Sequence, residues 1–447
     1  MQGLPRRNDV VGYSSVMVSI PLRPRALFSI IDKGCTLRVM YLAQFYHPMS
    51  SASTINHEIV RRLAERGHYV ELLVPSACFD ECPRKCTLRC NKLKGISVRR
   101  LPVPTFSAFK GHVSIRVLTY TLAYLPLILY ALIIARKKKL DLIIATYHVT
   151  HLAPFSAFLV SRIIKVPLVI KCHDVVFSEA RRFLGGKIFS SFLGHLNSMA
   201  LRHAKRVLVL SNELKFLMRE SYKVKDENFF IFPNSVDTRM FRNSEDSSDI
   251  REKLGVQGNK IIMHVAPSLK VSYRKKGLEF LIQALPKVVA KEPSVVLVVL
   301  GLTIERTQRE FESLASSLNI EKHVRFIKPV PYEDMPKYIA IADICIGPLC
   351  PSLDTYGSTP RKVLEYLACA KPVVACHGGV ARDLVMDGYN GFLVRYGDLE
   401  ALASRILKLV KNQKFARKLG LNARFHSLTF YDEKLLVDKL SNEILRI

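Results

Sequence analysis

The chain has 447 residues, of which 49% are hydrophobic and 23% are charged. This length exceeds one ordinary hydrophobic core and fits two or three α/β domains. The 21 glycines and 22 prolines are close to average usage, which excludes a fibrous or broadly disordered protein.

The formal net charge of +29 is concentrated in the first half of the chain. Residues 1–235 hold 35 Lys and Arg against 14 Asp and Glu, a net of +21, whereas the remainder holds 32 against 24, a net of +8. Such a field attracts acidic lipid headgroups, nucleic acid or phosphate-bearing substrates. A generally basic proteome is the alternative explanation. Because no nucleic-acid-binding motif accompanies the charge, we expect no nucleic-acid partner.

The first periodic elements predict a βαβ unit. Leu37–Phe45 is a continuous apolar run, typical of a buried parallel strand. A polar loop is expected over residues 47–54, followed by helical periodicity over Asn56–Arg66. Residues 69–76 predict the second strand, so the unit requires a parallel sheet and a right-handed crossover.

A stretch of 19 residues, Val117–Ala135, contains no charged side chain and is followed by the basic cluster Arg136–Lys139. Its length would nearly span a bilayer. However, Pro126 interrupts the run and the next core strand follows at once. We therefore expect a partly exposed apolar helix lying on an anionic membrane, with the basic cluster at the headgroups. A helix buried in the domain core is the alternative.

Further apolar runs predict an α/β protein with two doubly wound domains. The runs cover residues 141–145, 167–171 and 206–210, and then 261–265, 295–300, 324–327, 343–347 and 372–375. We expect a flexible leader over 1–36, a first domain over 37–232, a second over 233–415, and a C-terminal helix over 416–447 that returns to the first domain. Ligands should bind where the carboxyl ends of the strands face each other. No strand is followed by G-x-G-x-x-G, which argues against a nicotinamide dehydrogenase.

Four of the 10 cysteines are spaced every four residues, at Cys78, Cys82, Cys86 and Cys90. A metal site or disulfides are one interpretation, and a buried helical stripe is the other, although Pro83 argues against a continuous helix. Apolar contexts indicate small core residues at Cys172, Cys345, Cys369 and Cys376. The first residues lack the apolar region of a signal peptide, so we expect a cytosolic, reducing compartment.

Six segments carry a family resemblance when they are taken together and in order. They are RRLAERGHYVELLVP (61–75), KCHD (171–174), PNSVD with Phe241 (233–237), RKKG before LEFLIQAL (274–285), KVLEYLACAKPVVA (362–375), and Gly378-Gly379 with DGYNGFLV (387–394). They resemble the retaining GT-B glycosyltransferases with the group 1 or family 4 signature, which include sucrose synthase and phosphatidylinositol mannosyltransferases. The resemblance implies two Rossmann-like domains that face each other across a cleft.

The sequence departs from this family at three places. The family has two glutamates eight positions apart; the second matches Glu365, whereas the first falls on Gly357, with Asp354 close by. The glycine-rich turn after the first strand is replaced by Ser50-Ser51-Ala52, and a glycine-arginine pair by Ala266-Pro267. These departures leave the identity of the donor open.

The resemblance implies a donor site in the second half of the chain. Lys276, aided by Arg274 and Lys275, would stabilise a departing diphosphate, and a solvated basic turn is the alternative. Thr359 fits a helix N-cap and Pro360 the first helical position, so Ser358 and Thr359 would meet a donor phosphate. Glu365 would accept hydrogen bonds from the nucleotide ribose, and an ordinary surface glutamate is the alternative.

The resemblance also implies an acceptor side in the first half. His173 would approach the transferred sugar or the acceptor, and Asp174 would brace its loop, although a lone histidine beside a strand is more often structural. Ser50 and Ser51 would line the acceptor-side loop.

These features predict retaining transfer of a hexose or N-acetylhexosamine from a UDP- or GDP-sugar to a hydroxyl group of a lipid-linked or glycan acceptor. No metal or other cofactor is required. The alternatives are a non-catalytic nucleotide-sugar-binding subunit, favoured by Gly357, and a nucleotide-sugar epimerase of the same fold. We expect a cytoplasmic protein that is peripheral at the inner face of the membrane.

Overall fold

The computed structural model describes residues 36–43, 51–75, 94–101, 124–147, 152–172, 187–243, 248–266, 272–347, 350, 359–377 and 381–444. At residues 51–55, 75, 100–101, 187–190 and 272–276 it describes the backbone alone. The predicted leader, apart from Thr36, therefore lies outside the described residues.

The first half of the described chain builds a seven-stranded sheet with the order β3-β2-β1-β4-β5-β6-β7, and every described pairing in it is parallel. Its central strands are buried along their length, which is why they read as continuous apolar runs in the sequence. In sheet order the strands are Ile96–Leu101 (β3), Tyr69–Pro75 (β2), Arg38–Leu42 (β1), Leu142–Tyr147 (β4), Leu168–Cys172 (β5), Arg206–Val209 (β6) and Phe229–Ile231 (β7).

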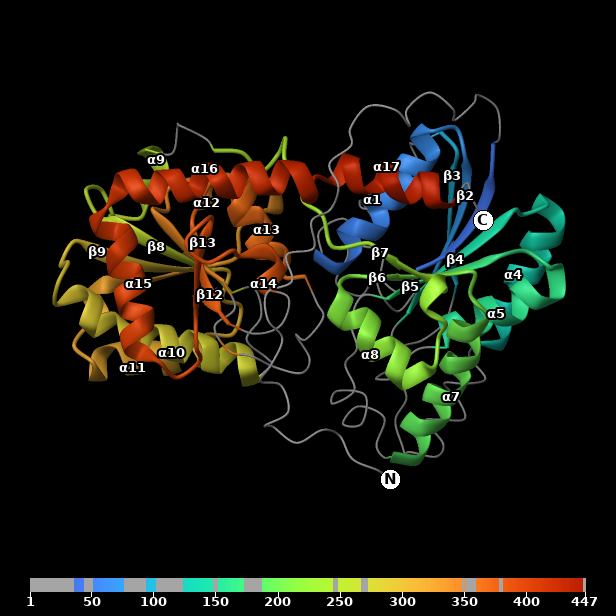
Figure 1. Cartoon of the computed structure of the whole chain (residues 1–447), viewed down its shortest axis with the longest axis horizontal. Coiled ribbons are helices and arrows are strands. Elements are labelled where there is room, and N and C mark those ends of the chain that lie inside the picture. Colours follow the sequence, from blue (N-terminus) through green and yellow to red (C-terminus); the bar gives the residue numbers. More distant parts are fainter. Residues whose placement is uncertain are drawn as a thin grey trace. The chain divides into compact units, whose positions relative to one another are not determined.

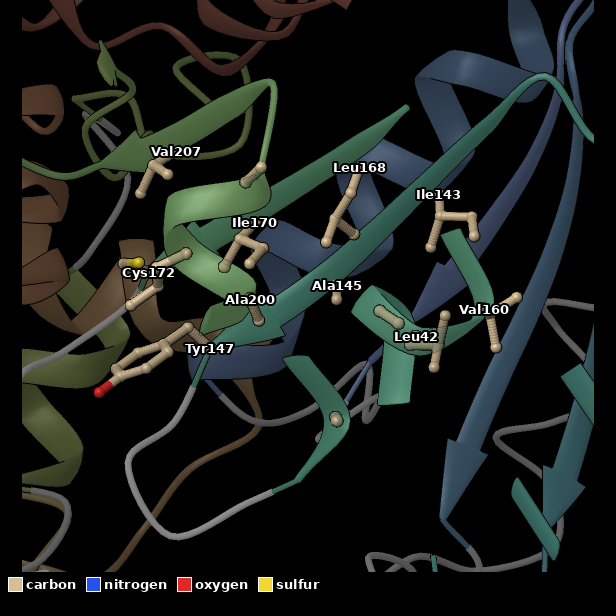
Figure 2. Packing of buried hydrophobic residues seen from close by; sticks show 14 of the residues in the cluster. Leu42, Ile143, Ala145, Tyr147, Val160, Leu168, Ile170, Cys172, Ala200 and Val207 are labelled. Atoms are coloured by element: carbon tan, nitrogen blue, oxygen red, sulfur yellow. The ribbon is translucent and has the colours of Figure 1, made fainter. Parts of the chain in front are cut away.

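Helices cover both faces of this first sheet (Figure 1). One face packs against Leu125–Lys138 (α4), Ala153–Ile164 (α5), Lys187–His203 (α7) and Asn212–Tyr222 (α8). Figure 2 shows this core, in which Leu42, Ile143 and Ile170 of the strands meet Val160 and Ala200 of the helices. The other face packs against Ser51–Glu65 (α1) and the C-terminal Glu433–Ile444 (α17), and a short 3-10 helix, Asp226–Asn228 (η3), precedes β7.

The second half builds a six-stranded parallel sheet with the order β10-β9-β8-β11-β12-β13. Its strands are Val324–Ile327 (β10), Val295–Leu300 (β9), Lys260–Val265 (β8), Ile344–Ile346 (β11), Val373–Cys376 (β12) and Gly391–Val394 (β13). One face packs against Ser272–Val289 (α10), Glu305–Ser317 (α11), Leu399–Lys411 (α15) and the start of Gln413–Phe430 (α16). The other face packs against Met335–Ala340 (α12), Arg361–Ala368 (α13) and Ala381–Leu384 (α14), near Ser248–Lys253 (α9) and the 3-10 helix Tyr332–Asp334 (η5). A second 3-10 helix, Glu321–His323 (η4), precedes β10.

The two doubly wound sheets confirm the predicted fold class. Each predicted strand is present, although the first ends at Leu42 and not at Phe45. The polar loop expected over residues 47–54 is wrong in part, because α1 already begins at Ser51. Three strands at the edges of the sheets, β3, β7 and β13, lack the long apolar runs of the central strands and were not predicted.

The uncharged stretch predicted over Val117–Ala135 is described only from Tyr124 onward. The break predicted at Pro126 agrees with the structure, because α4 begins at Leu125 and the proline occupies the first turn of the helix. A proline costs no intrahelical hydrogen bond at that position, since the amides of the first turn have no acceptor. No helix in the described part of the chain is both long enough and apolar enough to cross a membrane.

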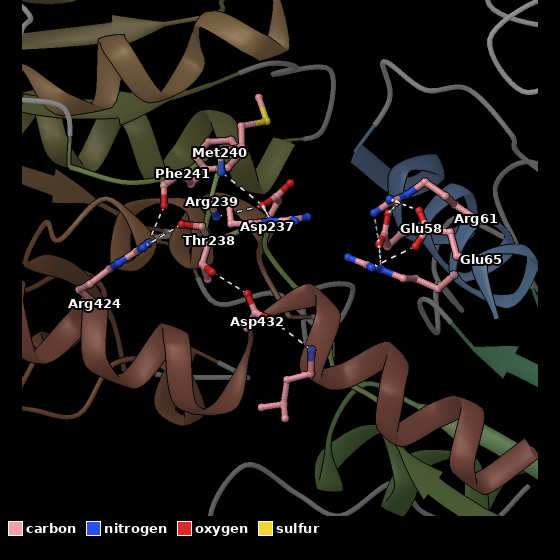
Figure 3. Close-up of polar contacts among 12 residues, drawn as sticks. Glu58, Arg61, Glu65, Asp237, Thr238, Arg239, Met240, Phe241, Arg424 and Asp432 are labelled. Atoms are coloured by element: carbon pink, nitrogen blue, oxygen red, sulfur yellow. Dashed lines mark hydrogen bonds and ion pairs between the residues drawn. The ribbon is translucent and has the colours of Figure 1, made fainter. Parts of the chain in front are cut away.

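Hydrogen bonds join the segment by which the chain enters the second domain, residues 236–241, to the segment by which it leaves, residues 424–432. Val236 and Asp432 form an isolated bridge, and Thr238 Oγ1 donates a hydrogen bond to Asp432 Oδ2 at 2.5 Å. Arg424 of α16 donates to the carbonyl oxygens of Phe241 at 2.6 Å and Thr238 at 2.8 Å (Figure 3). After Asp432, α17 packs its apolar side chains into the core of the first sheet.

Candidate functional site

Helix α13 is anchored at the carboxyl end of the second sheet. Lys362 Nζ donates to the carbonyl oxygen of Val265, the last residue of β8, at 3.0 Å. The hydroxyl of Tyr366 accepts from the amide of Val265 at 2.8 Å. In open α/β sheets, ligands bind at this end of the strands, so α13 presents its side chains where a ligand is expected.

Glu365 is a buried carboxylate within this helix, with 5% of its surface exposed, so an ordinary surface glutamate is excluded. Its Oε1 accepts a hydrogen bond from the hydroxyl of Tyr332 at 3.0 Å. That hydroxyl in turn accepts from Arg361 Nη2 at 3.1 Å. Burial raises the pKa of Glu365, while the positive charge of Arg361 and the Tyr332 hydrogen bond act in the opposite direction.

The predicted capping role of Thr359 is wrong. Pro360 is the N-cap of α13, which begins at Arg361, and no side chain caps this end of the helix. The Thr359 hydroxyl instead donates to the carbonyl oxygen of Leu210 at 3.5 Å. Asn234 Nδ2 donates to the carbonyl oxygen of Thr359 at 2.6 Å. Thr359 therefore connects α13 to residues near the end of β6 and β7, while Ser358 lies outside the described residues.

Arg274, Lys275 and Lys276 lie near the start of α10, and their side chains are not described. Helix α10 connects β8 to the parallel strand β9, so its N-terminus lies at the carboxyl end of the sheet. The unpaired amides and the dipole of such a helix start attract phosphate.

The predicted acceptor residues are described less completely. His173 and Asp174 follow Cys172, the last residue of β5, but they and Ser50 lie outside the described residues. Ser51 is the first residue of α1, with no description of its side chain.

Lys171 lies two residues before His173, and the sequence predicts no role for it. It is 1% exposed and donates to Asn56 Oδ1 at 3.3 Å, and Asn56 Oδ1 also accepts from the Tyr41 hydroxyl at 2.9 Å. Burial and the positive charge of Arg361 hold its pKa well below the ordinary value for lysine. A charged residue inside the apolar run PLVIK was the only sequence signal for it.

The cysteines separate into two groups. Cys172, Cys345, Cys369 and Cys376 are buried, as predicted. The run Cys78, Cys82, Cys86 and Cys90 lies outside the described residues, so its role as a metal site stays a prediction. Within the residues that are described, no cluster of His, Cys, Asp and Glu could hold a metal ion.

Each half of the chain matches a known family model. Residues 52–235 match the family model of the glycosyl transferase 4-like domain, and residues 246–426 match glycosyl transferases group 1. Together the two models cover more than half of the chain, and they include Glu365, Lys276 and His173.

Individual relatives agree with these models. A GDP-mannose-dependent α-(1-6)-phosphatidylinositol monomannoside mannosyltransferase of Mycolicibacterium smegmatis is 30% identical over 203 residues, which are 44% of this chain and only 50% of that protein. The N-acetyl-α-D-glucosaminyl L-malate synthase of Bacillus anthracis is 22% identical over 85% of this chain and 89% of its own.

Solved structures show the same fold. The crystal structure of Anabaena HepE in complex with UDP aligns with a TM-score of 0.71 and 21% identity, covering 92% of this chain and all 100% of that one. The two parallel sheets, the six ordered motifs and both family models thus lead to one assignment. The chain belongs to the group 1 glycosyltransferases of the GT-B fold.

Proposed function

We propose that the chain transfers a hexose or N-acetylhexosamine from a nucleotide sugar to a hydroxyl group, with retention of configuration at the anomeric carbon. The observation that carries this proposal is the buried carboxylate of Glu365 on α13, at the carboxyl end of the second sheet. A carboxylate in that place can accept two hydrogen bonds from the hydroxyl groups of a ribose.

In the proposed reaction, the bond between the anomeric carbon and the β-phosphate oxygen breaks, and positive charge develops on the sugar. The acceptor hydroxyl oxygen attacks from the face that the diphosphate leaves, and its proton passes to the departing phosphate. Lys276, with Arg274 and Lys275, stabilises the growing negative charge near the start of α10. Ser358 and Thr359 belong to the donor side, whereas His173, Asp174, Ser50 and Ser51 belong to the acceptor side. We propose that no metal or cofactor is needed.

The nucleotide is proposed to be UDP or GDP. The mycobacterial relative is named for GDP-mannose, and Anabaena HepE was crystallised with UDP, so both bases occur among similar proteins. A panel of UDP- and GDP-sugars should contain one donor that raises the melting temperature, because a ligand that binds only the native state stabilises it. Transfer from that donor should then be assayed with lipid and glycan acceptors.

With the donor in hand, Lys276→Ala is expected to lower kcat by about a hundredfold while binding of the free nucleoside is unchanged. The lysine is proposed to act on a charge that grows only as the diphosphate departs. Lys291→Ala, an exposed lysine just after the end of the same helix, is the matched control. Equal kcat for Lys276→Ala and wild type would reject this role.

Two alternative functions give different products. A nucleotide-sugar-binding subunit, favoured by Gly357 in place of the first family glutamate, would bind the donor without consuming it. An epimerase would convert the sugar without any acceptor. Product analysis with and without an acceptor separates both from a transferase.

We also propose that the protein is peripheral at the inner, anionic face of a membrane and that its acceptor is lipid-linked. Helix α4 supports this proposal. Leu125, Leu129 and Ile133 are 51%, 61% and 51% exposed, and their spacing places them along one face of the helix. The opposite side, including Leu127 and Ala131, is buried in the core.

The positive charges next to the exposed apolar residues of α4 favour an anionic membrane as the surface that covers them. The last turn of α4 and its C-cap carry four exposed cations, Arg136, Lys137, Lys138 and Lys139, and the first half of the chain has a net charge of +21. Apolar side chains beside cations match the boundary between acyl chains and acidic headgroups. The acceptor named for the mycobacterial relative is itself a lipid, a phosphatidylinositol mannoside.

A double variant, Leu129→Glu with Ile133→Glu, is expected to reduce flotation with anionic liposomes by about tenfold or more, because it replaces two apolar contacts by charges of the membrane's sign. Wild type should bind less at high salt. The matched control is Leu421→Glu with Phe425→Glu on α16, whose side chains are 68% and 61% exposed. Wild-type protein that fails to bind anionic liposomes at low salt would refute the membrane proposal and leave a soluble acceptor.

A further inference from the structure

We propose that Tyr332 is a positioning residue for Glu365: its hydroxyl holds one carboxylate oxygen, so that the other oxygen is aimed to bind the nucleotide ribose. This inference rests on the proposed function, since it assumes that Glu365 binds the donor. Tyr332 was not singled out by the sequence, because it lies 33 residues before Glu365 and outside every family motif.

The direction of the hydrogen bonds around Tyr332 follows from the chemistry of its partners. A guanidinium group carries only donors, so the Tyr332 oxygen must accept from Arg361 Nη2, which lies 3.1 Å away. The single hydroxyl hydrogen is then left to point at Glu365 Oε1, 3.0 Å away. A carboxylate has two oxygens, so Oε2 can accept from a ligand while Oε1 is held.

The ring of Tyr332 is held in place by the segment that leads into the second domain. Its centroid lies 5.4 Å from that of Phe241, at an interplanar angle of 59°. The backbone carbonyl of Phe241 accepts a hydrogen bond from Arg424 at 2.6 Å (Figure 3). The guanidinium group of Arg361 also lies 5.9 Å from the centre of the Tyr332 ring. A side chain fixed by packing can fix the group it contacts, as a preorganised site requires.

The hydroxyl also bears on the charge of Glu365. Burial raises the pKa of Glu365, whereas Arg361, the Tyr332 hydrogen bond and Lys362 lower it. Without the Tyr332 hydroxyl, one of the three interactions that lower the pKa of Glu365 is lost, so this pKa should rise further. If the ribose binds the ionised form, affinity is complete above this pKa and is lost as the pH falls through it. In Tyr332→Phe the loss should therefore begin at a higher pH.

The test measures the affinity of wild type and Tyr332→Phe for UDP and GDP by calorimetry, from mildly acidic to mildly alkaline pH. At neutral pH we expect about tenfold weaker binding in the variant, the scale of one hydrogen bond to a charged group. The midpoint of the pH dependence should also move upward. Tyr338→Phe is the matched control, because its side chain is also half-buried and its hydroxyl makes no hydrogen bond within the described residues. An unchanged midpoint in Tyr332→Phe overturns the inference, since a merely structural tyrosine would not move it.

Glu365→Gln separates failure of this inference from failure of the proposed function. In that background the pH dependence should be lost, and adding Tyr332→Phe should have little further effect, because the two residues act as one unit. If Glu365→Gln binds the nucleotide as wild type does, the proposed donor site is wrong. If Glu365→Gln weakens binding while Tyr332→Phe does not, the donor site stands and the role of Tyr332 is refuted.

Discussion

Replacing Glu365 with alanine is expected to abolish detectable glycosyl transfer and to weaken nucleotide binding by about tenfold to a hundredfold. Hydrogen bonds to a charged group contribute about 1.5–3 kcal/mol, and about 1.4 kcal/mol corresponds to a factor of ten. Transfer should suffer more than binding, because a displaced ribose also misplaces the sugar relative to the diphosphate-binding residues.

Calorimetry with the nucleotide and an assay with the complete donor check the two parts of this prediction. The matched control is Glu333→Ala, which removes an exposed glutamate next to Tyr332. Glu365→Ala should keep the native fold, with a melting temperature lowered by a few degrees at most, because the Tyr332 hydroxyl loses its acceptor. Unchanged nucleotide affinity would remove Glu365 from the donor site.

Gly420→Ala is expected to destabilise the second domain by on the order of 3 kcal/mol, the upper end of the usual range for overpacking. Gly420 lies in α16, where a Cβ atom would overlap the backbone carbonyl oxygen of Ala370. Neither partner can give way by a rotamer change, because both are backbone groups of packed segments. The melting temperature of this domain should fall by roughly 6–12 °C.

A second helical glycine provides the control. Gly194 lies in α7, and a Cβ atom there would meet nothing within 4 Å. Gly194→Ala should therefore be neutral or stabilise by up to about 1 kcal/mol, the difference in helix propensity. If both variants melt at the wild-type temperature, the close approach of α16 to Ala370 is not part of the native packing.

The fold class and most of the strands could be predicted from the sequence. The run VVLVVL marks β9 over Val295–Leu300, the range that the structure has. A strand of a parallel sheet with helices on both faces must be apolar on both sides, so it stands out without knowledge of its neighbours. The assignment of Glu365 and of the basic residues near the start of α10 to a donor site came from the resemblance of their motifs to the family, and it stays a prediction.

The group that meets Glu365 and the side of α4 that faces solvent depend on contacts between distant elements, so the folded chain is needed to identify them. The Tyr332 hydroxyl reaches the Glu365 carboxylate from 33 residues earlier in the chain, and no local periodicity encodes such a contact; Arg361 donates to that same hydroxyl. The uncharged run of α4 has no polar side to mark its exposed face; α5 and the first sheet cover one side and leave Leu129 and Ile133 uncovered. Thr359 likewise could have capped α13, but its hydroxyl bonds to Leu210, 149 residues away, because the fold brings that carbonyl within reach.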